Sequence, residues 1–162
     1  MALRNTVAIP CVVGSVEGTM TFYHYEGPGC SSALPPNEDA DLGLIPAVCN
    51  RIDRIEHVCS ISLARIIDLI PEHLDIELVK VDAQGLDLDV VKSAGTRLNK
   101  VGKFIIEAQD VVDEGRNMLS KAAVTRQAAI AWFNKNGYEI DLKRSYLENE
   151  AIREWNLAFD RT

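Results

Sequence analysis

The chain has 162 residues, 47% of them hydrophobic, and a formal net charge of -7 at pH 7. That length supports one hydrophobic core and is short for two ordinary domains, so we expect a single domain over residues 1–162. The acidic balance argues against nucleic acid as a partner, because phosphate contacts need clustered lysine and arginine side chains.

The cysteines, histidines and apolar runs bear on metals and on the compartment. Cys11, Cys30, Cys49 and Cys59 form no Cys-x-x-Cys pair, and we expect no metal site. An even number of cysteines allows two disulfides, but the sequence near the amino terminus lacks the pattern of a secretory signal. We therefore interpret the cysteines as reduced thiols of a cytoplasmic protein. No apolar run approaches the roughly 20 residues that span a bilayer, so we expect no membrane partner.

The first elements predicted along the chain are strands. Residues 7–13 and 19–25 form strand patterns around a turn at 14–18, the second with alternating residues, and together they predict a β-hairpin. Residues 26–41 are rich in glycine, proline, serine and acidic side chains, and they predict a long loop. Loops of this length are frequently functional, and this one is a candidate lid over a substrate.

The middle of the chain predicts a helix, a strand and a second helix. Apolar residues at helical spacing before Pro71 indicate a helix over 61–70, with a serine at position 60 or 62 as its cap. A short apolar run at 76–81 ends at a glycine turn, which favours a strand. The apolar positions that follow, 86–94, predict a helix.

The last part of the chain continues this alternation. A strand is expected at 103–110, a helix at 120–136 ended by Gly137, and strands at 138–142 and 155–159. This order predicts an α/β sandwich with a mostly parallel sheet and an antiparallel strand at one edge.

A family resemblance is carried mainly by KVDAQGLDLDVVKSAG at 80–95 and KFIIEAQD at 103–110. This pair resembles the FkbM family of S-adenosylmethionine-dependent methyltransferases, whose usual pattern is K-I-D-x-E-G-x-E followed by Gly-Ala and a later strand that ends in glutamate. Further similar segments are SVEG at 15–18, GCSSAL at 29–34, VCSISLARIIDLI at 58–70 and FNKNGY at 133–138. The resemblance implies a Rossmann-like class I methyltransferase sandwich, S-adenosylmethionine as cofactor, and methyl transfer to a hydroxyl of a small molecule or sugar.

The sequence departs from the family at its amino end. No Gly-x-Gly segment follows a strand there, and residues 1–13 are similar to the third strand of the fold, so the chain resembles the carboxyl-terminal two thirds of the domain. The cofactor site is then incomplete in this chain, and the alternative function is a catalytically inactive binding or assembly module. The family's first strand lies beside the strand at 76–81, so we also expect an exposed strand edge. That edge would form a homodimer or take up residues 7–13.

Asp82 and Glu107 are the candidate catalytic residues. Each is an acid at the carboxyl end of a predicted strand, where ligands bind in open α/β sheets. A carboxylate there can orient a substrate hydroxyl or accept its proton, although Asp82 could equally cap the next helix or pair with Lys80.

The resemblance also points to residues that would bind the substrate. Gln84 stands where the family's pattern has glutamate, which keeps hydrogen bonding but removes a charge. Ser31 and Ser32 belong to the segment similar to the family's serine-containing loop. No residue is assigned to the cofactor.

Overall fold

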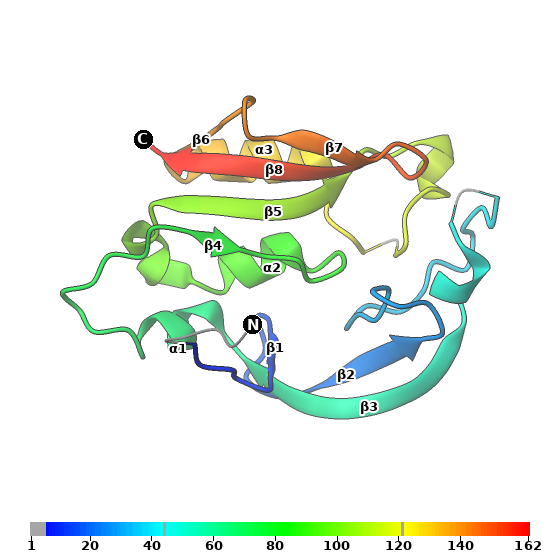
Figure 1. Ribbon diagram of the computed structural model, residues 1–162, viewed down its shortest axis with the longest axis horizontal. Coiled ribbons are helices and arrows are strands. Elements are labelled where there is room, and N and C mark those ends of the chain that lie inside the picture. Colours follow the sequence, from blue (N-terminus) through cyan, green and yellow to red (C-terminus); the bar gives the residue numbers. More distant parts are fainter. Residues whose placement is uncertain (1–5, 44, 121) are drawn as a thin grey trace.

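The computed structural model describes residues 6–43, 45–120 and 122–162, and within these residues the strands form two sheets (Figure 1). The first sheet has the order β1-β3-β2, with bounds Val12–Val13, Ile52–Ile61 and Gly18–Tyr25. The second has the order β4-β5-β8-β6, with bounds Val79–Lys80, Lys103–Gln109, Glu154–Arg161 and Tyr138–Ile140. Strand β7, Tyr146–Asn149, also pairs with β8.

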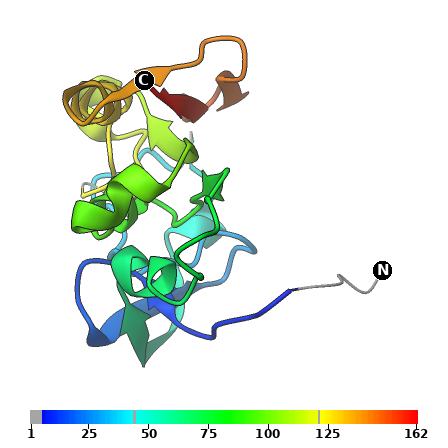
Figure 2. The same ribbon diagram turned by 90° about the vertical axis from the view of Figure 1, so that its left-hand side faces the viewer.

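Short helices connect the strands. The α-helices are α1, Leu63–Ile67, α2, Asp87–Lys92, and α3, Arg126–Lys135. Single turns of 3-10 helix span Ala47–Cys49 and Asp113–Gly115, and a longer 3-10 helix spans Gly95–Lys100. Figure 2 shows α2 and α3 on one side of the second sheet, to the left of its strands.

The helix boundaries follow from local capping. The Ser62 hydroxyl accepts a hydrogen bond from the Arg65 backbone N–H at 3.2 Å, and the Thr125 hydroxyl does the same for Ala128 at 3.2 Å. Such caps satisfy N–H groups that the first helical turn leaves without partners. Gly137 follows α3 with a φ of 81°, the left-handed conformation that glycine adopts at low cost. The predicted cap at Ser62 and the predicted end at Gly137 are both confirmed.

The core lies between the second sheet and the helices on that side. Phe104 and Ile106 of β5 and Leu157 and Phe159 of β8 are almost fully buried. The ring of Phe133, on α3, stacks on Phe159 with 3.9 Å between ring centroids. Because side chains alternate along a strand, this packing places every second residue of β5 on the opposite face of the sheet.

The mixed α/β class is confirmed, but the mostly parallel sheet is wrong. Only β1–β3 and β4–β5 are parallel among the described strand pairs, whereas β2–β3, β5–β8, β6–β8 and β7–β8 are antiparallel. Short links without a crossover helix join β6, β7 and β8, and such links favour antiparallel neighbours.

The predicted hairpin between 7–13 and 19–25 is also wrong. Strand β3 lies between β1 and β2, and β2 pairs with it from Gly18↔Ser60 to Tyr25↔Ile52. β1 is reduced to two residues, beginning after Pro10, which has no N–H to donate to a ladder. Residues 7–13 are therefore not taken up beside β4, whose edge opposite β5 has no strand partner within the described ranges.

The reduced-thiol interpretation is corrected by two disulfides, Cys11–Cys59 and Cys30–Cys49. The first follows from the β1–β3 register, which pairs Val12 with Ser60 and so places Cys11 beside Cys59. The second follows from a backbone hydrogen bond between Gly27 and Val48, which brings the loop after β2 against the residues before β3. Both contacts join segments distant in sequence, and cysteine spacing alone carries no signal of them.

Candidate functional site

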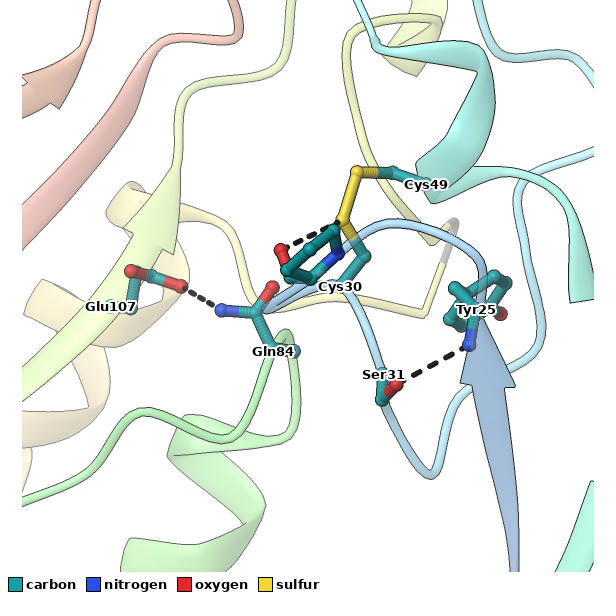
Figure 3. Close-up of a disulfide and its surroundings, with 7 residues drawn as sticks. Tyr25, Cys30, Ser31, Cys49, Gln84 and Glu107 are labelled. Carbon is teal, nitrogen blue, oxygen red and sulfur yellow. Dashed lines mark hydrogen bonds between the residues drawn. A yellow bond between two sulfur atoms is a disulfide. The ribbon is translucent and has the colours of Figure 1, made fainter. Parts of the chain in front are cut away.

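The candidate site lies where β4 and β5 run side by side in parallel. Asp82 follows β4, and Glu107 projects from β5 on the face opposite the core. The Gln84 side-chain Nε2 donates to an oxygen of Asp82 at 3.2 Å and to an oxygen of Glu107 at 3.3 Å (Figure 3 shows the second contact). The structure thus brings together three of the residues singled out from the sequence.

The loop that carries Gln84 has an unusual backbone. Gln84 has a φ of 48° and Gly85 a φ of 99°, both in the region that favours glycine. A β-carbon on Gly85 would lie 2.9 Å from the Ala123 side chain, so this position has no room for a larger residue. The loop is therefore tightly constrained, and it directs the Gln84 amide toward Glu107.

Asp87 holds this loop against β5, a role that the sequence analysis missed. Its side chain is buried and accepts hydrogen bonds from the backbone N–H groups of Ala83, Gly85 and Glu107 at 3.3, 3.3 and 3.0 Å. Burial raises the pKa of this carboxyl, and the three donors partly oppose that effect. The available signal was the third acid of the K-I-D-x-E-G-x-E pattern, which Asp87 matches.

The Glu107 carboxyl has a raised pKa and holds its proton near neutral pH. Burial, followed by the charge of Glu154 and that of Asp82, raises its pKa from 4.5 to about 8. Glu154 lies on the neighbouring strand β8, and burial raises its pKa to about 7. Glu154 was also missed, because only the β5–β8 register reveals that it approaches the site.

Asp82, unlike Glu107, has a lowered pKa. Its carboxylate pairs with the Lys80 ammonium at 2.9 Å, and hydrogen bonds from Lys80 and Gln84 lower its pKa below the ordinary value. The side chain is 49% exposed. Asp82 therefore remains ionised at neutral pH and has little basicity.

The two predicted serines contact the site differently. Ser32 is buried, and its hydroxyl donates to the backbone carbonyl of Gln84 at 2.9 Å. Ser31 instead accepts from the Tyr25 backbone N–H at 3.3 Å. Figure 3 shows both the Tyr25–Ser31 contact and the adjacent Cys30–Cys49 disulfide, which ties this serine loop to the residues before β3.

A groove of about 640 Å³ opens between the two sheets beside the free edge of β4. Its lining is mostly apolar and comes from β1, β2, α1 and the segment around β4. The lining residues nearest the site are Ser31, Lys80, Asp82 and Gln84. The site therefore borders a space of the size that small-molecule ligands occupy.

In the ranges that the structure describes, no group of three or more His, Cys, Asp or Glu side chains is arranged to hold a metal ion. None of the described helices has the length and apolar character needed to cross a membrane.

Residues 2–140 match the family described as the Methyltransferase FkbM domain. No curated protein matches the chain, and no solved structure matches it. The matched range contains Asp82, Gln84, Asp87 and Glu107, and Glu154 lies beyond it.

Proposed function

Because the chain belongs to the FkbM methyltransferase family, we propose that it takes part in S-adenosylmethionine-dependent methyl transfer to a hydroxyl of a small molecule or sugar. The family supports a methyltransferase, and the acceptor and the methyl donor are our proposal. We also propose that the second sheet belongs to a Rossmann-like methyltransferase sandwich, since β4 and β5 are parallel and α2 follows β4 directly.

The observation that carries the proposal is the position and pKa of Glu107. A hydroxyl that accepts a methyl group must lose its proton, and a base is most effective when its pKa lies near the working pH. Glu107, with a pKa of about 8, is matched to that task. We assign it the role of general base, which receives the proton of the acceptor hydroxyl on its carboxylate.

The neighbouring residues would position the acceptor and the base. Asp82 stays ionised and accepts a hydrogen bond from the acceptor hydroxyl without removing its proton. Gln84 holds the Glu107 carboxylate through its amide, and Ser32 holds the Gln84 backbone. Ser31 lines the groove and would contact the substrate there.

The described residues do not make a whole cofactor site. The groove volume falls within the roughly 300–1,000 Å³ of ligand pockets, so S-adenosylmethionine would fit by size. Asp82 is the one carboxylate among the described lining residues, and it is already paired with Lys80. The same lining includes no glycine, the residue that permits close approach of backbone to a ligand. We therefore assign no residue to the cofactor.

Product formation tests the proposal. The protein is incubated with S-adenosylmethionine and a panel of sugars, and S-adenosylhomocysteine is measured by mass spectrometry. Glu107→Gln should lower the rate by roughly 100-fold or more, the scale of acid–base catalysis. Asp82→Asn should lower it by roughly tenfold, the effect of one hydrogen bond. Glu72→Gln, at an exposed loop position, is the control. If the Glu107→Gln protein kept the parental rate at every pH, Glu107 would not be the general base.

A second candidate is a catalytically inactive binding or assembly module of the same fold. The incomplete cofactor fit favours it. Calorimetric titration with S-adenosylmethionine separates the two candidates. A low micromolar dissociation constant, about 8 kcal/mol of binding, would favour the enzyme. Absence of both binding heat and product would favour the module.

A further inference from the structure

The face of the second sheet opposite the core carries acids from three strands. The register places Asn156 of β8 across from Glu107 and places Glu154 across from Gln109, so these side chains share that face. Tyr146 of β7 pairs with Asn156, and Glu148 of the same strand reaches this face, since its carboxylate accepts a hydrogen bond from the Asn156 side chain. The charges of both Glu148 and Glu154 act on Glu107.

These acids form no ion pair among the described residues. The Lys80 ammonium pairs with Asp82, and its charge also acts on Glu107 and Glu148 without an ion pair to either. In the described part of the chain, Glu107, Glu148 and Glu154 form no ion pair with a lysine, arginine or histidine. Several half-buried carboxylates close together are costly unless they hold protons or a positive charge joins them.

Asn156 adds an independent sign of a missing donor. Its side chain is 2% exposed and lies between two of the acids, across from Glu107 and with its Nδ2 donating to Glu148. Its Oδ1 is buried and has no hydrogen-bond donor among the described residues. Buried polar atoms are normally satisfied, so this oxygen points to a ligand that brings an N–H or O–H group.

A small cavity lies beside Glu107 and Glu154. It has a volume of about 10 Å³ and four polar lining residues, Gln84, Glu107, Gln109 and Glu154. The rest of its lining is Gly85, Ala108, Leu119, Ala123 and Val124. That space accommodates one group of the size of a water molecule. A primary ammonium has this size and brings three donors with a positive charge, whereas a quaternary ammonium is too large.

We infer that this face binds a primary ammonium group, carried by the methyl acceptor beside the hydroxyl that is methylated. The inference rests on the proposed function and names its substrate class, an amino sugar or other amino alcohol. The ammonium would sit against the Glu154 carboxylate, which leaves the Glu107 carboxylate to the acceptor hydroxyl.

Binding of two matched sugars tests the inference. The probes are glucosamine and N-acetylglucosamine, which share a ring and differ in the ammonium. Heteronuclear NMR spectra follow the backbone amides of Gln84, Gly85 and Glu107 during titration, without S-adenosylmethionine and at constant ionic strength. Glucosamine should bind at least tenfold more tightly than N-acetylglucosamine. Glu154→Gln should abolish the preference, and Glu72→Gln should leave it unchanged.

Three outcomes would overturn the inference. The first is equal binding of the two sugars, and the second is an undiminished preference for glucosamine in the Glu154→Gln protein. The third is equal NMR shifts with potassium chloride alone, which would show that the site binds an inorganic cation. Because no methyl donor is present, the test is independent of catalysis. An ammonium preference without methyl transfer would refute the proposed function and leave the binding site. Methyl transfer to uncharged sugars only would refute the substrate class and leave the function.

Discussion

The Glu107 backbone N–H donates to the Asp87 carboxylate at 3.0 Å, so an acid at the start of α2 holds the strand that carries the proposed base. The other Asp87 oxygen accepts from the two N–H groups that flank Gln84. One buried side chain thereby fixes both the base and the amide that contacts it.

Loss of the Asp87 carboxylate should destabilise the fold. Asp87→Ala leaves three backbone N–H groups without their acceptor, and we expect the free energy of unfolding to fall by roughly 3 kcal/mol or more. Urea unfolding measures this change. Asp89→Ala is the matched control, since Asp89 lies on the same helix, is 51% exposed and pairs with Lys92. Its substitution should cost less than about 1 kcal/mol. Equal effects of the two substitutions would show that Asp87 is not the anchor.

The pH dependence of stability should report the raised pKa of Glu107. The pKa is 4.5 for an ordinary glutamate and about 8 for Glu107, and about 7 for Glu154. Between these values the folded state binds more protons than the unfolded state, so the free energy of unfolding falls as pH rises from about 5 to 8. Glu107→Gln cannot ionise and should flatten this fall.

Urea unfolding at a series of pH values across that window measures the effect. Glu72→Gln, in the exposed loop after α1, should keep the parental slope. A Glu107→Gln protein with the same slope as the parent would show that Glu107 titrates at an ordinary pKa.

The Cys30–Cys49 disulfide should stabilise the serine loop. The two cysteines are 19 residues apart, and closing a loop of that length in the unfolded chain is worth about 3 kcal/mol. We expect the double variant Cys30→Ser, Cys49→Ser to lose about that much in urea. The signals of Ser32 and Gln84 should also broaden in NMR spectra. If the double variant were as stable as the oxidised parent, the bridge would carry no stabilisation.

The free edge of β4 should support self-association, as a homodimer. Leu78 precedes β4 and is 48% exposed beside the groove, and exposed strand edges template pairing with other chains. We expect sedimentation velocity to show a concentration-dependent dimer, which Leu78→Lys weakens. Leu142→Lys is the control, because Leu142 is 71% exposed after β6, away from this edge. A parent that stays monomeric at high concentration would contradict the prediction.

Local sequence signals predicted the local structure well. Periodicity and capping located α1, α2 and α3, and the apolar runs located β5 and β8. The acids that follow or lie within β4 and β5 were found because strand ends in α/β sheets are recognisable positions. The helix predicted over 120–136 was too long at its start, where Thr125 caps α3.

Pairing between distant segments could not be predicted in the same way. The insertion of β3 between β1 and β2, the Cys11–Cys59 disulfide, and the approach of Glu154 to Glu107 depend on contacts across 30 or more residues or on sheet register. The Cys30–Cys49 disulfide spans 19 residues and depends on how the loop after β2 folds. Asp87 was missed for another reason. An acid at a helix start is common, so the match of Asp87 to the family pattern did not single it out, and its burial does.

The backbone conformation of Gln84 lowers stability, while its side chain serves the proposed site. A φ of 48° costs a side-chain-bearing residue about 1 kcal/mol relative to glycine. Gln84→Gly would relieve that strain and would also remove the amide that contacts Asp82 and Glu107. A chain optimised only for thermal endurance would therefore carry glycine here, whereas the glutamine supplies the amide at the expense of backbone strain.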